Sequence, residues 1–276
     1  AGNYDLIIDL QCNDRTRLLL SALLVSGCRV RWRISNRPGF PYNISHPKLP
    51  GSTHVFQRMR ASLLAAGIPA NTERPVLHGS DAQRKRASAI MDESGLEDGR
   101  FAVFLPGSHA AGLTKRWGVH NYRQLAQLMK GAGLNNVVLL GGADEVDECA
   151  AIAEGESGYV VNLCGRTQLL ELPPIFERAA MIVANDTGTA HLAAASNQRM
   201  IVICGPTDPR RVKPVGKGVI AIQADVSCKN CYRKTCDHHS CMKFVTPEQV
   251  MDLAGSVAGW HPPAAPAGDL SSAPHK

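Results

Sequence analysis

The 276-residue sequence is poor in aromatic residues and contains no long hydrophobic run. Phenylalanine, tyrosine and tryptophan together make up 5% of it, so a folded core must be mainly aliphatic. No apolar stretch approaches the roughly 20 residues that a helix needs to span a bilayer. No signal peptide opens the chain either. We therefore expect a cytoplasmic protein without a membrane-spanning helix.

Short apolar runs are present instead, and they alternate with amphipathic segments. The runs expected to form strands are Phe101–Leu105, Asn136–Leu140, Tyr159–Leu163, Met181–Ala184, Met200–Cys204 and Val219–Gln223. Between the first two, apolar residues recur from Tyr122 to Met129 at the spacing of one helix face. This alternation predicts an α/β fold with a parallel, doubly wound sheet, which binds ligands beyond the carboxyl ends of its strands.

The loop Asn185–His191 lies at such an end and joins an apolar run to an Ala-rich helix. The unpaired N–H groups of a helix N-terminus favour an anion. Asp186 adds a carboxylate, and the neighbouring threonines add hydroxyls, a mixture that suits a sugar diphosphate. The alternative is a plain Asp/Thr helix cap with nothing bound.

Two further polar loops follow the same plan. After Leu105 the chain reads Pro-Gly-Ser and then Thr114–Trp117, where the cations Lys115 and Arg116 could neutralise phosphate or could simply be solvated. After Leu140 come two glycines and the acidic pair ending at Glu145. These carboxylates could stabilise a helix N-terminus or hold ribose hydroxyls.

Together these motifs resemble glycosyltransferase family 9, the ADP-heptose:lipopolysaccharide heptosyltransferases. The segments Gly205–Pro209, Cys241-Met242 and Thr246–Val250 match the family's pattern as well. Several ordered motifs at matching spacing are far more specific than a lone Gly-rich loop. The resemblance implies a GT-B-type fold of two Rossmann-like domains with parallel sheets.

The resemblance also implies roles for individual residues. The donor-binding set is Ser108, Thr114, Lys115, Gly142, Glu145, Asp186, Thr187, Gly188, Thr189 and His191. In it Lys115 meets the diphosphate, Glu145 the adenosine ribose and Asp186 the heptose. The reaction implied is inverting transfer of heptose from ADP-L-glycero-D-manno-heptose to the lipopolysaccharide inner core, with no catalytic cofactor. Lys115 then acts catalytically, by stabilising the departing diphosphate.

The front of the chain departs from the family. The family opens with a strand and a Gly-rich loop carrying the catalytic base, whereas this chain opens directly at a later strand, and Cys12 stands where the family has glycine. Asp9, in the strand, and Asp14, at a natural N-cap position, are candidate substitutes, and the base stays unassigned. A sugar-nucleotide-binding homologue without transferase activity is therefore an alternative.

Three regions are expected along the chain: an abbreviated acceptor-side domain over residues 1–95, a donor-binding domain over 96–260, and a disordered Pro/Ala/Ser-rich tail over 261–276. Within the second, Thr246 and Gln249 form a capping box with Pro247 at the first helical position, which predicts a helix there.

Positive charge is concentrated in the first region. Residues 1–95 hold 13 lysines and arginines against 7 acidic residues, which accounts for the whole net charge of +6. Such a surface would attract an anionic lipopolysaccharide core and the inner membrane surface, to which the protein would bind peripherally. Alternatively, Arg29, Arg31 and Arg33 lie on the wet face of a strand with Val30 and Trp32 inward.

Nine cysteines fall into two groups. Cys12, Cys28, Cys149, Cys164 and Cys204 are scattered, and buried free thiols are the default for them. Cys228, Cys231, Cys236 and Cys241 form a C-x2-C-x4-C-x4-C cluster that could enclose structural zinc or iron. Disulfides or free thiols are the alternatives. With Tyr232 between the thiols, the cluster also resembles a zinc-knuckle RNA-binding module. That interpretation leaves the three polar loops unexplained, so no nucleic acid is expected as a partner.

Overall fold

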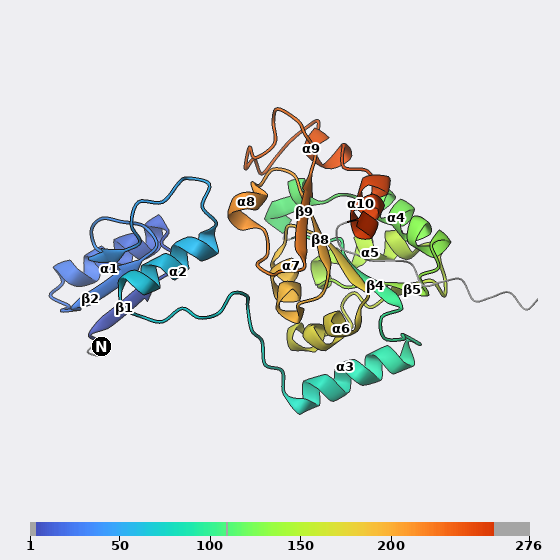
Figure 1. Ribbon diagram of the computed structural model, residues 1–276, viewed down its shortest axis with the longest axis horizontal. Helices are drawn as coiled ribbons and strands as arrows, with labels where there is room; N and C mark the ends of the chain where they lie inside the picture. Colours follow the sequence, from blue (N-terminus) through green and yellow to red (C-terminus); the bar gives the residue numbers. More distant parts are fainter. Residues whose placement is uncertain (1–3, 109, 257–276) are drawn as a thin grey trace, which may run out of the picture. The chain divides into compact units, whose positions relative to one another are not determined.

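The computed structural model describes residues 4–108 and 110–256. The chain divides into two compact units: the first runs to Glu73 and includes Arg210–Val212, and the second holds the rest (Figure 1). The sequence-based boundary at residue 95 is therefore displaced. Helix α3 (Asp81–Glu93) buries Ala87 and Met91 in the core of the second unit and so belongs to it. The tail expected over 261–276 lies outside the described residues.

The first unit contains a small parallel sheet. Its strands, in the order β1-β2-β3, are Leu6–Asp9, Trp32–Ser35 and Ile44–Ser45, and its helices are α1 (Asp14–Val25) and α2 (Val55–Ala65). Asn13 caps α1 by accepting the Thr16 N–H at 2.9 Å, so Asp14 is the first helical residue and not the cap. Of the two residues that the alternative interpretation of the basic strand places inward, Val30 is buried, but Trp32 is 44% exposed, with the Arg31 guanidinium 4.9 Å from its ring centroid.

The second unit is built on a six-stranded parallel sheet in the order β6-β5-β4-β7-β8-β9. In chain order the strands are β4 (Phe101–Leu105), β5 (Asn136–Leu139), β6 (Val160–Asn162), β7 (Met181–Asn185), β8 (Met200–Cys204) and β9 (Val219–Gln223). All six expected strands are thus confirmed. Most read as continuous apolar runs because helices cover both faces of the sheet.

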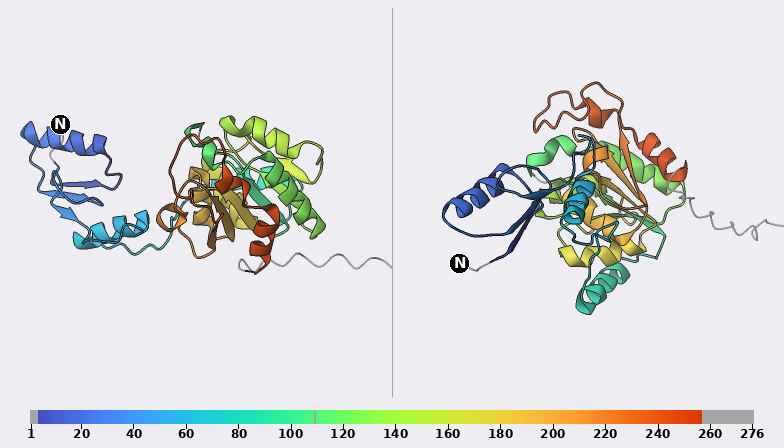
Figure 2. Two further views of the ribbon diagram at one scale, coloured as in Figure 1. Left: turned by 90° about the horizontal axis from the view of Figure 1, so that it is seen from above. Right: turned by 60° about the vertical axis from the view of Figure 1, so that its left-hand side comes forward.

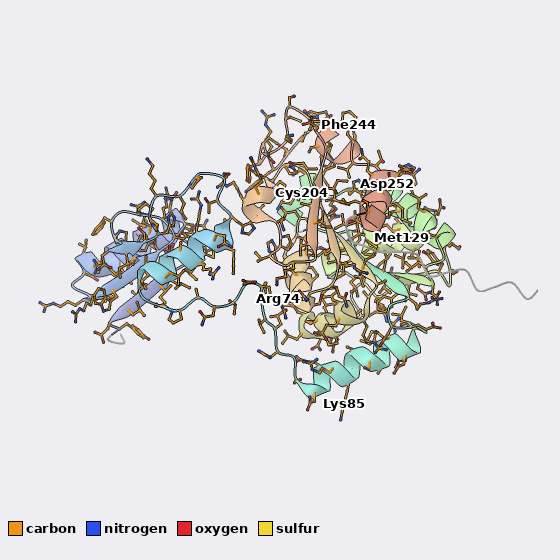
Figure 3. All side chains as sticks on the ribbon, viewed as in Figure 1. Arg74, Lys85, Met129, Cys204, Phe244 and Asp252 are labelled. Atoms are coloured by element: carbon orange, nitrogen blue, oxygen red, sulfur yellow. The ribbon has the colours of Figure 1, made fainter. Side chains whose placement is uncertain are left out.

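Helices form two layers around this sheet (Figure 2). One layer contains α4 (Val119–Gly131), α5 (Val146–Ala153) and α10 (Pro247–Ser256), and the other contains α3, α6 (Leu172–Arg178) and α7 (Gly188–Ala193). Shorter helical elements are η1 (Ala110–Lys115), η2 (Ala143–Glu145), η3 (Leu169–Glu171), η4 (Ala194–Ser196), α8 (Pro209–Val212) and α9 (Ser240–Lys243). The capping box that begins α10 is confirmed, because Thr246 and Gln249 exchange hydrogen bonds of 3.0 and 3.3 Å. Lys85, on the exposed face of α3, points away from the sheet (Figure 3).

The strand order places the ligand-binding edge of this sheet. From β4 the chain first moves to one side, forming β5 and β6, and then returns to pair β7 on the other side of β4. The loops that leave β4 and β7 therefore part in opposite directions at the carboxyl edge. In open α/β sheets such a switch point forms a crevice that binds ligands.

We predict that Leu125→Ala destabilises the second unit by about 2–5 kcal/mol, because it empties a fully buried site between α4 and the sheet. Urea unfolding followed by circular dichroism measures the change. Gln127→Ala, on the exposed face of the same helix, is the control and should change stability by about 0.5 kcal/mol or less. Equal losses in the two variants would contradict this packing.

Candidate functional site

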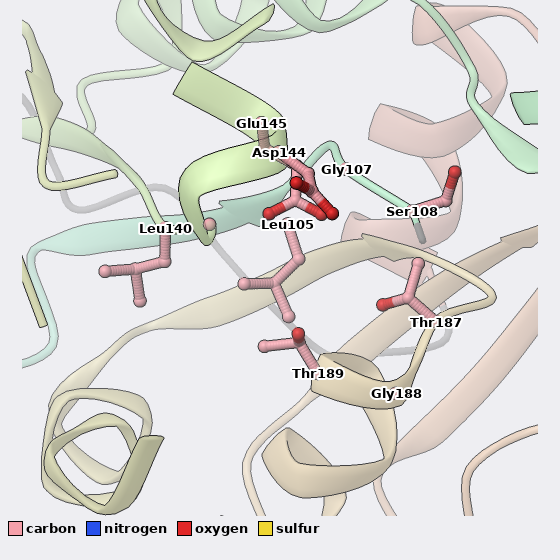
Figure 4. Close-up of a pocket in the computed structure, with 10 residues that line it drawn as sticks. Leu105, Gly107, Ser108, Leu140, Asp144, Glu145, Thr187, Gly188 and Thr189 are labelled. Atoms are coloured by element: carbon pink, nitrogen blue, oxygen red, sulfur yellow. The ribbon is translucent and has the colours of Figure 1, made fainter. Parts of the chain in front are cut away.

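A pocket of about 250 Å³ lies at the switch point (Figure 4). Three loops form it, one each from the ends of β4, β5 and β7. Its lining residues are Leu105, Gly107, Ser108, Leu140, Gly141, Asp144, Glu145, Thr187, Gly188 and Thr189. The polar loops singled out in the sequence thus meet in one place, with hydroxyls, carboxylates and two leucines around a shared space.

Asn185, the last residue of β7, joins two of these loops and is wholly buried. Its side-chain NH₂ donates to the Pro106 carbonyl and, at 3.4 Å, to the Gly107 carbonyl. Its side-chain oxygen accepts the Trp117 N–H at 3.3 Å and the Tyr122 hydroxyl at 3.2 Å. The NH₂ group and the oxygen of a buried amide both need hydrogen-bond partners. Asn185 therefore fixes where the loop after β4 leaves the sheet and where it re-enters α4.

Lys115 and Asp186 form an ion pair beside the pocket. Lys115 Nζ lies 2.8 Å from Asp186 Oδ2 and 3.2 Å from the Asp186 backbone oxygen. The hydroxyl of Thr207 donates to the same carboxylate oxygen at 2.7 Å. The Asp186 side chain is 5% exposed and that of Lys115 is 31% exposed. One carboxylate oxygen, Oδ2, therefore already has two partners within the protein, and the ammonium remains within reach of a ligand.

Glu145 is held in a fixed position in the pocket wall. Its Oε2 accepts the Gly142 N–H at 2.5 Å, and its side chain passes over Gly107. A Cβ atom at residue 107 would lie 2.0 Å from Glu145 Cγ, so any residue other than glycine would displace the Glu145 side chain. Asp144, the other member of this acidic pair, also lines the pocket, although it is not in the predicted donor-binding set.

The structure divides the predicted donor-binding set into three groups. Ser108, Glu145, Thr187, Gly188 and Thr189 line the pocket, Lys115 and Asp186 pair beside it, and Thr114, Gly142 and His191 do not line it. Thr114 faces a different cavity and donates to the Arg233 carbonyl at 3.0 Å. His191 lies exposed on α7. Thr207 and Asn185 were missed as site residues, although Thr207 lies in the Gly205–Pro209 motif.

The two candidate bases, in the first unit, differ in their surroundings. Asp9 accepts the Cys12 N–H at 2.7 Å and the Tyr42 hydroxyl. Burial would raise the pKa of Asp9, but these hydrogen bonds outweigh it and lower the pKa. A carboxylate engaged in this way is a weak proton acceptor. Asp14 is 93% exposed and lies 3.2 Å from Arg37.

A second ion pair contacts the pocket wall at Ser108. Arg116 NH1 lies 2.9 Å from Glu148 Oε2, a contact of charge and not of a well-aligned hydrogen bond. The same guanidinium donates to the Ser108 carbonyl at 3.0 Å. Burial raises the pKa of Glu148, Arg116 lowers it and Glu145 raises it, with a net increase. Glu148 thus orients Arg116, which in turn holds Ser108.

All nine cysteines are free thiols, and their burial is not uniform. Cys28 is exposed, contrary to the default expectation, whereas Cys12, Cys149 and Cys204 are buried. A second cavity of about 220 Å³ is lined by Thr114, Pro206, Cys228, Cys231, Arg233, Cys236, His238, His239 and Cys241. Within the described residues, no three His, Cys, Asp or Glu side chains already stand at metal-binding separations. Burial and the three neighbouring thiols raise the pKa of Cys241.

The sequence matches the profile of glycosyltransferase family 9 (heptosyltransferase) over residues 1–241. The chain belongs to glycosyltransferase family 9. This family-9 chain is 30% identical over 158 residues to lipooligosaccharide heptosyltransferase 2 of Haemophilus influenzae, covering 54% of this chain and 44% of that protein. It is 27% identical over 229 residues to lipopolysaccharide heptosyltransferase 1 of Escherichia coli, covering 81% and 68%.

Solved structures share the fold of this family-9 chain. The E. coli ADP-heptose lipopolysaccharide heptosyltransferase II superposes with a TM-score of 0.67 at 20% identity, covering 93% of this chain and 76% of that one. The expected α/β, GT-B-type fold with parallel sheets is thereby confirmed. The chain spans about half the length of the curated relatives it matches.

We predict that Glu148→Gln changes how stability depends on pH. Because the folded state raises the pKa of Glu148, it binds a proton more tightly than the unfolded state does. The wild type should therefore lose stability relative to the variant as pH rises from about 4.5 through the raised pKa. Urea unfolding at a series of pH values measures this difference. A wild type that gains on the variant across that window would refute the assignment.

Proposed function

We propose that this chain transfers heptose from ADP-L-glycero-D-manno-heptose to the inner core of lipopolysaccharide, with inversion at the anomeric carbon. The observation that carries the proposal is the single pocket at the switch point, with the Lys115 ammonium held beside it. Family membership and relatives named as lipopolysaccharide heptosyltransferases support the substrate class. The name of one structural relative includes ADP-heptose as well.

The pocket chemistry fits the parts of such a donor. Glu145 accepts hydrogen bonds from the ribose hydroxyls, because its carboxylate is already oriented by Gly142. The hydroxyls of Ser108, Thr187 and Thr189 surround the diphosphate. The Lys115 ammonium neutralises the diphosphate charge, and Asp186 binds the heptose hydroxyls. The predicted set also includes Thr114, Gly142 and His191. They do not line the pocket, so in this proposal they support the residues that do.

The reaction proceeds by displacement. An acceptor hydroxyl forms a bond to the anomeric carbon while the bond from that carbon to the diphosphate oxygen breaks. The hydroxyl proton passes to a base, and ADP leaves with the bonding electron pair. Negative charge grows on the leaving diphosphate, so a fixed ammonium stabilises the transition state more than the ground state. In this proposal no metal takes part in the transfer.

The acceptor is an anionic lipid, and charge supports that assignment. The net charge of +6 lies in residues 1–95, where it attracts the phosphorylated lipopolysaccharide core. Across the described residues the helices are all too short or too polar to cross a bilayer. We therefore propose peripheral association with the cytoplasmic face of the inner membrane.

We predict that Lys115→Ala lowers kcat by about 10²–10³-fold, because the developing charge on ADP loses its cation. The assay follows ADP release from ADP-heptose on lipopolysaccharide that lacks heptose. Lys130→Ala is the matched control, since Lys130 pairs with Glu156 on the exposed face of α4 and should leave turnover unchanged. Unchanged turnover in Lys115→Ala would rule out this site. Binding of ADP-heptose without turnover in the wild type would indicate a binding protein.

We predict that Glu145→Ala reduces discrimination between ADP and 2′,3′-dideoxy-ADP. In the wild type the carboxylate loses its ribose partners when the dideoxy ligand binds, at a cost of about 1–3 kcal/mol. The variant should bind both ligands with similar affinity. Titration calorimetry of the two nucleotides against both proteins measures the difference. If the wild type does not distinguish the nucleotides, Glu145 does not contact the ribose.

A further inference from the structure

The segment between β9 and α9, residues 224–239, contains neither helix nor strand. Loops of this length inside a compact domain are uncommon unless they are functional. Asn230, Tyr232 and His239 adopt left-handed backbone conformations, with φ of 63°, 56° and 53°. The segment is tied to the rest of the unit at separate points: the Tyr232 N–H donates to the Pro206 carbonyl at 2.8 Å, and the Gln223 side chain donates to Asn230 Oδ1 at 2.9 Å.

Four thiols of this segment and its flank face one cavity, as described above for Cys228, Cys231, Cys236 and Cys241. Cys241 is buried in the hydrophobic core, whereas Cys228 and Cys236 are half-buried and Cys231 is exposed, so apolar packing holds only one of the four thiols in place. The loop offers no apolar cluster of its own that would explain the arrangement. The feature that does recur along the loop and its flank is a thiol facing this cavity.

We propose that this cavity binds one soft divalent cation, zinc or ferrous iron, through the four thiolates. Tetrahedral coordination by four cysteines is a closed structural site, and both metals accept it. Lys229, Arg233 and Lys234 add positive charge to the same loop, which offsets the net negative charge of a divalent ion held by four thiolates. The sulfurs line the cavity without yet converging, so binding draws the loop inward around the ion.

The histidines beside the cavity serve a different purpose. His239 Nε2 lies 2.6 Å from the Thr114 carbonyl, and His238 Nδ1 lies 3.0 Å from the Ser240 hydroxyl. Each ring thus already uses one nitrogen in a hydrogen bond. The proposal assigns coordination to the four sulfurs, and His239 links segment 224–239 to Thr114.

That link connects the metal to the donor pocket, a step that rests on the proposed function. Thr114 directly precedes Lys115, and its hydroxyl donates to Arg233 of the cysteine loop. On the other side, α9 packs so closely on Gly205 that a Cβ there would lie 2.4 Å from Met242 Sδ. Gly205 opens the turn that carries Thr207, the partner of Asp186. The metal therefore braces both ends of the Lys115–Asp186–Thr207 contact.

The test begins with the purified full chain kept under reducing conditions. Inductively coupled plasma mass spectrometry should find one zinc or iron ion per chain, and its identity distinguishes the two metals. Four thiols should react with a disulfide reagent only after a chelator is added. Cys231→Ser and Cys236→Ser should lose the metal, whereas Cys28→Ser, an exposed thiol elsewhere, should retain it.

Cobalt substitution tests the site independently of what the cell supplies. Adding Co²⁺ to the chelated protein should produce thiolate-to-metal charge-transfer bands and the visible bands of a tetrahedral ion. Absence of these bands, together with thiols that react equally with and without chelator, would overturn the proposal. A disulfide that persists between any two of the four cysteines under these reducing conditions would also overturn it.

The coupling to the donor pocket is measured separately. Chelation should weaken ADP binding by roughly 5- to 150-fold, the range typical of linked sites, and added zinc should restore it. If the affinity for ADP is the same with and without the metal, the metal does not brace the donor pocket. If the metal-loaded protein binds no ADP at all, the proposed function fails while the metal measurements stand on their own.

Discussion

The buried amide of Asn185 is the constraint on which the rest of the site depends. Four groups from the loop after β4 and from α4 converge on its side chain, and all four hydrogen bonds are buried. Leaving one such group unpaired costs about 1–3 kcal/mol. The loop that carries Ser108 and Lys115 therefore has one arrangement in which all partners are satisfied. The residue after Asn185 is Asp186, so the same constraint also sets the carboxylate that meets Lys115.

Two neighbouring cations in that loop have separate acidic partners. Lys115 pairs with Asp186, and Arg116 pairs with Glu148 on the opposite side. Side chains at successive positions point in different directions. Lys115 can therefore bind a ligand beside the pocket, while Arg116 holds the loop through Glu148 and Ser108. The Lys-Arg pair could not be divided in this way from sequence, because the partners lie about 70 and 30 residues away and only the fold brings them close.

Much of the sheet could be predicted from sequence because its central strands are buried on both faces and leave nearly uninterrupted apolar runs. The domain boundary could not, since α3 is amphipathic and its periodicity does not say which sheet it covers. Within the site, the three loops could be found by residue type. The position of Thr114 toward the cysteine cavity and the entry of Asp144 into the pocket depend on loop conformation, which the local sequence does not specify.

The fit of Glu145 over Gly107 has a thermodynamic consequence. With its Cγ next to Gly107 and one carboxylate oxygen held by Gly142, this side chain is already restricted in the folded protein. Immobilising a flexible side chain during association usually costs about 0.5–1.5 kcal/mol in entropy. Here that cost falls on folding, so affinity at this position reflects the hydrogen bonds themselves.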